Sequence, residues 1–315
     1  LMHVTLIMPA MGCKPGEPYV ASWKMEPLGL ATLAALTPPE ISLSFFDDRL
    51  EPIIYDQPTD LVAINVETYT ARRAYDIARR FRQRAVPVIM GGYHATLMPE
   101  ETAQHCDSVL LGEAEQLWGK VLMDAAAGRL AQRYQADGLT EMGSLLPRRE
   151  IFHGKRYLPI RLVETGRGCR FACRFCSISG FFGSRYQGRP IEVIVEEIRR
   201  LKTRNLFLID DNIVSDLDRA KDLFRALIPL RIRWVSQGSI TMAEDEELLG
   251  LMRRSGCVGV LIGFESLQTD TLKRMGKGWN KGHRSYRQAI QRLHRYGIAI
   301  YATFMFGYDG EDERI

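Results

Sequence analysis

The sequence predicts an α/β protein with two parallel sheets in succession, an N-terminal open, Rossmann-like sheet and then a parallel barrel or open partial barrel. Short apolar runs alternate with segments of helical length along most of the chain, which favours parallel strands joined by helices. Polar or glycine residues follow these runs, where the ligand-binding ends of parallel strands lie. A stretch without clear periodicity, residues 128–160, separates the two series. We therefore expect domains at 1–140 and 161–315, with a linker at 141–160.

The composition is that of an ordinary globular protein and argues against nucleic-acid binding and against a transmembrane segment. The chain has 315 residues, 46% of them hydrophobic, and a formal net charge of +4. Its basic residues are spread among acidic ones, which argues against nucleic-acid binding. No apolar run reaches the roughly 18–20 residues of a transmembrane segment, and no signal pattern opens the chain. Cys13, Cys106 and Cys257 are scattered as reduced thiols would be, so we expect a cytoplasmic protein.

The N-terminal half contains five apolar runs of strand length and three helical segments. Pro9 ends the first run, and Pro27 stands where a buried helix begins. The expected strands are 4–8, 41–46, 61–66, 86–90 and 108–111, and the expected helices are 27–36, 71–84 and 115–127. Ligands of such sheets bind beyond the carboxyl ends of the strands, so the candidate loops are 47–49, 67–69, 91–94 and 112–113.

The C-terminal half repeats the alternation of strand and helix. The expected strands are 157–163, 205–209, 233–236, 258–264 and 298–306, and the expected helices are 191–201, 221–227, 245–255 and 285–296. The polar ends of these strands should converge on one mouth. The start, Leu1-Met2-His3-Val4, suggests a tag remnant or a trimmed chain, and the end suggests a fragment truncated near the fifth or sixth strand, or a minimal barrel.

Cys169, Cys173 and Cys176 carry the most informative chemistry in the chain. They stand at i, i+4 and i+7 in a loop after a strand, and Gly166-Arg167-Gly168 lets the backbone fold tightly there. Three thiolates can hold a four-iron cluster with one iron left open for chemistry. A structural zinc site would need a fourth Cys or a nearby His, and the closest downstream His is His283. A chance grouping is the other alternative.

The spacing Cys-x3-Cys-x2-Cys, with aromatic Phe175 before the last cysteine, resembles the signature of the radical S-adenosylmethionine (SAM) superfamily. The resemblance implies that SAM chelates the open iron of a [4Fe-4S] cluster and is cleaved to methionine and a 5′-deoxyadenosyl radical. It places Phe175 beside the adenine and matches Glu265, in Gly263-Phe264-Glu265-Ser266, to a position that commonly serves SAM. It also implies a partial barrel of six units, whose sixth strand would lie beyond residue 315.

Other polar residues at the expected strand ends are candidates for binding SAM or the substrate. SAM carries a sulfonium, an ammonium and a ribose diol, so its pocket needs carboxylate and polar groups. Asp210, Asp211, Gln237 and Ser239 could supply them. Helix capping or loop structure is the alternative for the two aspartates, because Asp is a favoured N-cap.

Three pieces of the N-terminal half resemble the cobalamin-binding domain that precedes the cluster domain in a large class of radical SAM enzymes. They are Pro27-Leu28-Gly29-Leu30-Ala31, Gly91-Gly92-Tyr93-His94 and Leu111-Gly112-Glu113-Ala114-Glu115. The resemblance implies a set of cobalamin contacts, namely Leu28, Gly29, Asp48, Arg49, Thr68, Tyr69, Gly91, Gly92, Tyr93, His94, Gly112 and Glu113.

One departure from the cobalamin pattern concerns the lower face of the cobalt. Domains that ligate cobalt from below carry Asp-x-His-x-x-Gly, whereas Asp47-Asp48-Arg49 stands here. A guanidinium has no lone pair to donate, so Arg49 cannot be an ordinary cobalt ligand. His94 is the nearest rival, and we expect it to contact the corrin side chains instead. A degenerate domain that no longer holds the cofactor is the alternative.

The two resemblances together imply a cobalamin-dependent methylase acting at an unactivated carbon through the 5′-deoxyadenosyl radical and methylcobalamin. The alternatives are a radical SAM enzyme doing cyclisation, oxidation or carbon–carbon coupling, or a non-catalytic cobalamin or cluster carrier. The open iron argues against a carrier. Arg167, Arg170 and Arg174 could receive an acidic electron donor such as a flavodoxin or ferredoxin, or be solvated surface residues. Lipids, tetrapyrroles, antibiotic precursors and peptides all remain open as substrates.

Overall fold

A computed structural model describes residues 2–12, 24–136, 138, 140–280 and 283–311. The chain divides into two compact units, which are treated separately. The first comprises Leu1–Glu141 and Leu145–Leu158, and the second Met142–Ser144 and Pro159–Ile315.

The first unit is built on a six-stranded parallel sheet with the strand order β2-β1-β3-β4-β5-β6. Its strands are β1 (His3–Met8), β2 (Ser42–Asp47), β3 (Leu61–Asn65), β4 (Val88–Gly91), β5 (Ser108–Leu111) and β6 (Arg133–Gln135). The chain reverses direction along the sheet after β1, and at such switch points the strand ends open a crevice for a ligand.

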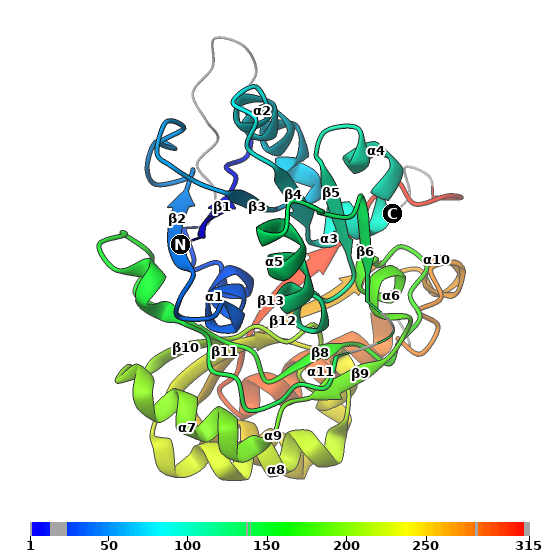
Figure 1. Ribbon diagram of the computed structural model, residues 1–315. Helices are drawn as coiled ribbons and strands as arrows, with labels where there is room; N and C mark the ends of the chain where they lie inside the picture. The colour runs from blue at the N-terminus through cyan, green and yellow to red at the C-terminus, as the bar shows by residue number, and fades with distance from the viewer. Residues whose placement is uncertain (1, 13–23, 137, 139, 281–282, 312–315) are drawn as a thin grey trace. The chain divides into compact units, whose positions relative to one another are not determined.

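Helices cover both faces of this sheet, as a doubly wound fold requires (Figure 1). They are α1 (Leu28–Leu36), α2 (Ala71–Arg82), α3 (Tyr93–Leu97), α4 (Pro99–Ala103) and α5 (Trp118–Ala126), with 3-10 turns η1 (Thr68–Thr70), η2 (Ala114–Gln116) and η3 (Arg149–Phe152). Ile77 and Phe81 of α2 pack on one face, and Leu30 of α1 with Trp118 of α5 pack on the other. Successive strand residues alternate between these two cores, so both faces are apolar.

The second unit contains a five-stranded parallel sheet with the order β13-β12-β11-β10-β7, in which β13 is an edge strand. Its strands are β7 (Arg161–Val163), β10 (Asn205–Leu208), β11 (Arg233–Gln237), β12 (Cys257–Glu265) and β13 (Ala299–Phe304), beside an antiparallel hairpin of β8 (Gly166–Gly168) and β9 (Tyr186–Gly188).

Helices alternate with these strands along the chain, and α7, α8 and α9 lie side by side along the sheet in Figure 1. The elements are α6 (Ser177–Phe182), α7 (Ile191–Leu201), α8 (Leu217–Leu227), η4 (Ile228–Leu230), η5 (Ile240–Glu244), α9 (Glu246–Ser255), α10 (Thr269–Arg274) and α11 (His283–Arg295). Ile194, Phe224 and Leu248 pack with Trp234 of β11 in one continuous core. This core fixes where the strands end, and so where the polar loops begin.

The predicted fold class, two successive α/β units with parallel sheets, is confirmed. The predicted helix 221–227 begins earlier, at Leu217, because the Asp216 side chain accepts a hydrogen bond from Arg219 N and caps it. The predicted strand 157–163 is confined to Arg161–Val163. The elements that were not predicted are short: β6, the β8–β9 hairpin, the helices α3, α4, α6 and α10, and the 3-10 turns.

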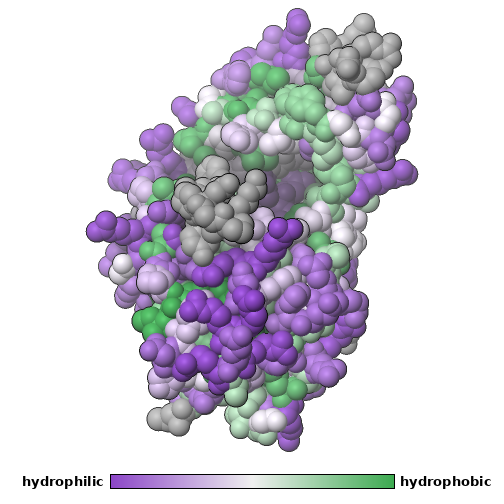
Figure 2. Space-filling view, turned by 90° about the horizontal axis from the view of Figure 1, so that it is seen from above, coloured by the Kyte–Doolittle hydropathy of each residue, from purple (hydrophilic) through white to green (hydrophobic). Residues whose placement is uncertain are grey.

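Hydrophilic residues cover much of the face seen in Figure 2, and hydrophobic residues form smaller patches on it. No helix among the described residues is both long and apolar enough to cross a membrane.

Candidate functional site

The loop that carries the three cysteines is anchored by two aspartates from the end of the neighbouring strand. Asp210 is fully buried, and its two carboxylate oxygens accept hydrogen bonds from Thr165 N at 2.7 Å and Thr165 Oγ1 at 2.6 Å. Asp211 accepts a hydrogen bond from Gly168 N at 2.7 Å. The pair therefore holds the segment that leads directly into Cys169.

Burial alters the ionisation of both anchors. Burial raises the pKa of Asp210 to about 7, against the lowering effect of the Thr165 hydrogen bonds. Burial likewise raises the pKa of Asp211 to about 6. The predicted contact of Asp210 with SAM stays untested, but Thr165 engages both of its oxygens. The geometry favours the loop-structure alternative for both residues.

Cys169, Cys173 and Cys176 are free and partly exposed in this loop. Burial raises the pKa of the Cys173 thiol, and the nearby Lys277 ammonium opposes that shift. Among the described residues, no group of three or more His, Cys, Asp or Glu side chains is arranged to hold a single metal ion. In a four-iron cluster each thiolate binds its own iron, so three accessible thiols on one loop fit the cluster better than they fit one ion.

A segment that the sequence did not single out, residues 275–280, braces the cysteine loop. Met275 O accepts a hydrogen bond from Arg174 N at 2.9 Å, and the ring of Trp279 stacks on Phe171 with centroids 3.9 Å apart. Gly276 has a φ of +71°, and a Cβ there would lie 2.9 Å from Ala172 O. The close approach of the two backbones requires glycine at this position.

Glu265 lies at the carboxyl end of β12 in a backbone conformation that is unusual for a side-chain-bearing residue. Its φ is +64°, and the β12–β13 register shifts beside it. Its carboxylate pairs with Lys277 Nζ at 2.9 Å, and the two side chains are 12% and 9% exposed. Lys277 Nζ also donates to Gly263 O at 2.8 Å. The predicted SAM residue Glu265 is therefore held in place by a lysine that sequence reasoning missed.

The other predicted SAM residues occupy neighbouring strand ends in the second unit. Phe175 is partly buried against the core, and Gln237 is the last residue of β11. Ser239 is buried, and its hydroxyl lies 2.6 Å from Thr241 Oγ1. The loops after β7, β10, β11 and β12 therefore all emerge at the carboxyl edge of this sheet.

Arg49, in the first unit, is held in a buried ion pair. Its Nη2 lies 2.6 Å from Asp47 Oδ2 and donates to Met25 O at 2.8 Å. Tyr157 Oη also donates to Asp47 Oδ2, and burial raises the pKa of that tyrosine. Asp48 pairs separately with Arg73 at 2.7 Å. The predicted cobalamin residues Asp48 and Arg49 thus both have partners within the protein.

His94 is buried, and both of its ring nitrogens are engaged. Nε2 lies 2.9 Å from Tyr75 Oη, and Nδ1 lies 3.3 Å from Thr68 Oγ1. Tyr75 Oη donates to Glu101 Oε1 at 3.0 Å, so it accepts from His94 Nε2–H. This arrangement does not favour His94 as a cobalt ligand, because it leaves neither nitrogen free.

The remaining predicted cobalamin residues lie at the start of α1 and at the carboxyl ends of β3, β4 and β5. Leu28 is buried, whereas Gly29 is exposed and has no atom within 4 Å of where a Cβ would be. Thr68 and Tyr69 are exposed, Tyr69 to 59%. Gly91, Gly92, Tyr93 and Gly112 follow β4 and β5, and the buried Glu113 carboxylate accepts from Thr140 N.

This edge fits a corrinoid held by backbone and side-chain contacts. Open backbone at Gly29 permits close approach of a large ring, and exposed Tyr69 offers an aromatic surface. Glu67, two residues before Tyr69, has a pKa raised to about 7 by burial. A histidine beneath the cobalt does not fit, since His94 is internally bonded.

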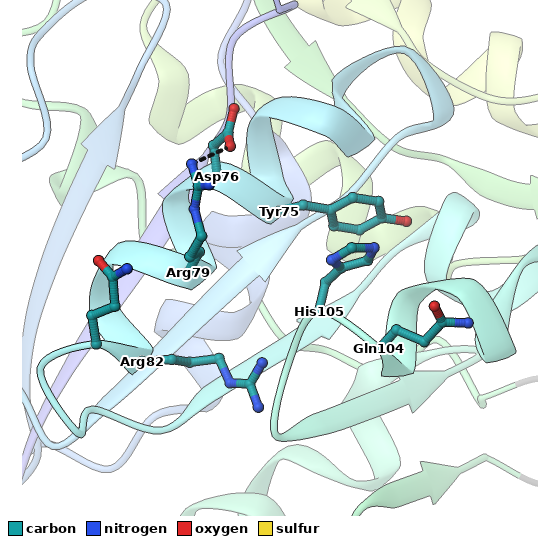
Figure 3. A pocket seen from close by; sticks show the side chains of 7 residues that line it. Tyr75, Asp76, Arg79, Arg82, Gln104 and His105 are labelled. Atoms are coloured by element: carbon teal, nitrogen blue, oxygen red, sulfur yellow. Dashed lines mark hydrogen bonds and ion pairs between the residues drawn. The ribbon is translucent and has the colours of Figure 1, made fainter.

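A separate hollow lies between α2 and α4 (Figure 3). The ring of Tyr75 stacks on His105 there with centroids 3.8 Å apart, and Arg79 pairs with Asp76. Its other lining residues are Arg82, Gln83 and Gln104. Arg82 and Gln83 precede β4, and Gln104 and His105 precede β5, so these residues lie toward the amino ends of the strands. Tyr75, which also lines the hollow, contacts the predicted residue His94.

Comparison with known proteins gives two family matches. Residues 163–314 match the model of the Radical SAM superfamily, and residues 23–121 match the model of the B12 binding domain. The structure resembles that of the radical S-adenosylmethionine methyltransferase TsrM from Kitasatospora setae, with a TM-score of 0.79 over 99% of this chain and 69% of that one. The two are 17% identical, so this likeness shows the fold alone.

Two curated relatives come from Chlorobaculum tepidum. Bacteriochlorophyllide d C-12(1)-methyltransferase is 32% identical over 302 residues, which cover 91% of this chain. Bacteriochlorophyllide d C-8(2)-methyltransferase is 30% identical over 301 residues, which cover 89% of this chain. This chain spans 66% of the length of each relative.

These matches confirm the resemblance drawn from the cysteine loop and from the glycine-containing strand ends. They also confirm, at the level of the family, the predicted cofactors: an iron–sulfur cluster, SAM and cobalamin. The chain belongs to the family of B12-binding radical SAM enzymes.

Proposed function

We propose that this chain is the cofactor-binding part of a cobalamin-dependent radical SAM methyltransferase that transfers a methyl group to an unactivated carbon. The observation that carries the proposal is the three-thiol loop at the carboxyl edge of one parallel sheet, in a chain whose other sheet matches the B12 binding domain. Both C. tepidum relatives, which cover 91% and 89% of this chain, are named as methyltransferases.

The chain's own residues would bind and shield these cofactors. Cys169, Cys173 and Cys176 would hold the cluster, and Phe175, Gln237, Ser239 and Glu265 would line the SAM pocket. Leu28, Gly29, Thr68, Tyr69, Gly91, Gly92, Tyr93, Gly112 and Glu113 would bound the corrinoid site, in which Arg49 and Asp48 shape the loop rather than ligate cobalt. When bound, the cluster and SAM supply an organic radical that removes hydrogen from carbon, and the corrinoid supplies the methyl group.

The stoichiometry follows from these roles. Each turnover would use two SAM molecules. One gives its methyl group and leaves S-adenosylhomocysteine. The other yields methionine and 5′-deoxyadenosine, which carries away the hydrogen removed from the substrate. An external donor must supply two electrons, one to cleave SAM and one to return the corrinoid to its methyl-accepting state.

A tetrapyrrole is the substrate class that we propose, because both C. tepidum relatives are named for bacteriochlorophyllide d. A small acidic electron carrier such as a flavodoxin or ferredoxin is the proposed reductant. Arg167 already pairs with Glu164 and Arg170 with Asp216, so exposed Arg174 is the rim residue best placed to meet it. A cytoplasmic location belongs to the same proposal and rests on the free thiols of the described residues.

Anaerobic reconstitution with iron, sulfide and hydroxocobalamin tests the proposal. We expect the visible spectra of both an iron–sulfur cluster and a corrinoid, and formation of 5′-deoxyadenosine from SAM with a chemical reductant. Cys173→Ala should abolish that product, whereas the buried Cys257→Ala, outside the loop, should not. With a bacteriochlorophyllide and methyl-deuterated SAM, the product should gain the labelled methyl group.

The outcomes separate the candidate functions. 5′-Deoxyadenosine without a methylated product, across tetrapyrrole substrates, would indicate non-methylating radical chemistry. A protein that takes up no corrinoid would overturn the methylase proposal. Persistence of 5′-deoxyadenosine in Cys173→Ala would overturn the cluster assignment.

A further inference from the structure

Asn212, in the loop after β10, contacts one of the three cysteines directly. Its side chain is buried, with 3% of its surface exposed, and its Nδ2 lies 3.4 Å from Cys169 Sγ. In the described part of the chain, no side chain donates a hydrogen bond to Sγ of Cys173 or Cys176. Cys169 is therefore distinguished from the other two thiols by its surroundings.

The orientation of the Asn212 amide follows from its other neighbours. Its Oδ1 accepts hydrogen bonds from two backbone groups, Val214 N at 3.3 Å and Ser239 N at 3.1 Å. A flipped amide would set its NH2 group against these two N–H donors, which is unfavourable. The two backbone donors thus require the oxygen to face them and the NH2 group to face Cys169 Sγ.

A hydrogen bond from a neutral donor to a ligating sulfur withdraws electron density from the cluster. Reduction adds negative charge to the iron–sulfur core and its thiolates, so the donor stabilises the reduced state more than the oxidised state. Asn212 is buried, so water screens this effect little.

We propose that Asn212 tunes the reduction potential of the cluster held by Cys169, Cys173 and Cys176, through its hydrogen bond to the Cys169 thiolate. Asn212 is a positioning residue, not a ligand, and the inference rests on the proposed function because it requires the cluster. Its hydrogen bond makes the cluster easier to reduce, so that a weaker electron donor suffices.

Two substitutions separate the donor from the structural role of the side chain. Asn212→Asp keeps an oxygen for Val214 N and Ser239 N but replaces the NH2 donor with an acceptor. Asn212→Ala removes the donor without adding charge. Ser215→Ala is the matched control: Ser215 Oγ accepts from Arg170 N at 2.9 Å in the same cysteine loop and, among the described residues, donates to no cysteine sulfur.

The measurement is a redox titration of the reconstituted chain, without SAM, followed by the electron paramagnetic resonance signal of the reduced cluster. At a fixed ambient potential we expect the ratio of reduced to oxidised cluster to fall about tenfold in Asn212→Asp, which is about 59 mV for a one-electron couple. We expect a fall of about threefold in Asn212→Ala and less than twofold in Ser215→Ala.

Wild-type-like titration of both Asn212 variants would overturn the inference and leave the proposed function intact. An equal fall in Ser215→Ala would also overturn it, because general loosening of the loop would then explain the shift. Failure of the wild-type chain to assemble any cluster would instead overturn the proposed function, and the inference with it.

Discussion

Arg49 and Asp47, two residues apart in the chain, form a bidentate ion pair, with Arg49 Nε 2.8 Å from Asp47 Oδ1 and Arg49 Nη2 2.6 Å from Asp47 Oδ2. The Asp47 side chain is 0% exposed and that of Arg49 is 11% exposed. Two parallel N–H···O bonds from a guanidinium give such a pair a fixed geometry. The loop after β2, where cobalt-ligating domains place their histidine, is therefore ordered here by an internal ion pair.

Arg49→Met should destabilise the fold markedly, because it leaves the Asp47 carboxylate buried without its counter-charge. We expect a loss of about 3–5 kcal/mol in the free energy of unfolding, measured with urea at neutral pH. Arg79→Met is the control, since Arg79 pairs with Asp76 on the surface and should cost about 0–1 kcal/mol. Equal losses in the two variants would contradict the role given to burial.

Two glycines of the proposed corrinoid site should respond differently to substitution by alanine. Gly92 has a φ of +103°, and a Cβ there would lie 2.5 Å from Asn65 Oδ1 and 2.9 Å from Val66 O. We expect Gly92→Ala to cost about 1–3 kcal/mol in unfolding free energy. Gly29 lies in α1 with open space around it, so Gly29→Ala should leave the fold as stable or slightly more stable.

Corrinoid uptake then tests the assignment of Gly29. If the ring approaches the backbone there, Gly29→Ala should bind hydroxocobalamin several-fold more weakly while unfolding at the same urea concentration as the parent chain. Unchanged uptake, followed by the visible spectrum after gel filtration, would remove Gly29 from the site.

Gly276→Ala should impair the cysteine loop. A Cβ there would lie 2.9 Å from Ala172 O, and alanine rarely adopts the φ of +71° found at this position. Either the cysteine loop or the segment 275–280 must therefore shift. We expect the iron content after anaerobic reconstitution to fall to less than half. Gly278→Ala is the matched control two residues away, where the nearest atom is Lys273 Cγ at 3.5 Å and iron content should be unchanged.

Glu67 should make the stability of the protein depend on pH. Its pKa in the folded state is about 7 because of burial, against 4.5 as the unperturbed value, so the folded state binds the proton more tightly than the unfolded state. This contribution favours folding below about pH 4.5 and is lost as the pH rises through about 7.

Glu67→Gln should therefore remove that dependence. Relative to the parent chain, we expect the variant to gain about 1–3 kcal/mol of unfolding free energy between pH 5 and pH 8, measured by urea denaturation. A difference between the two proteins that does not change over this range would show that folding does not raise the pKa of Glu67.

Much of the fold could be predicted because buried parallel strands form apolar runs in the sequence. Val4 to Met8 and Leu61 to Asn65 show this clearly, and both lie in β-strands of the first unit. The β8–β9 hairpin could not be predicted, because strands such as Gly166–Gly168 are three residues long and carry no apolar alternation. The partner strand of β8, β9, lies nearly twenty residues further along the chain, so no local pattern indicates the pairing.

The candidate site could be predicted only in part, because only some of its residues lie close together in the sequence. The cysteine spacing is local, so Cys169, Cys173 and Cys176 could be assigned from the sequence alone. Asn212 and Lys277 act across 43 and 12 residues, on Cys169 and Glu265 respectively, and no local pattern marks such contacts. The pairing of Arg49 with Asp47 was missed because sequence shows which charges are present but not which are buried together.

The edge strand β13 affects how this protein should be handled. In the described residues its outer side has no neighbouring strand, and Tyr301 and Phe304 are 65% and 43% exposed. Free backbone groups beside partly exposed aromatic rings form a template for adding a strand from another molecule. Preparations of these residues should self-associate as they are concentrated, so light scattering across a dilution series should come before any spectroscopy of the cofactors.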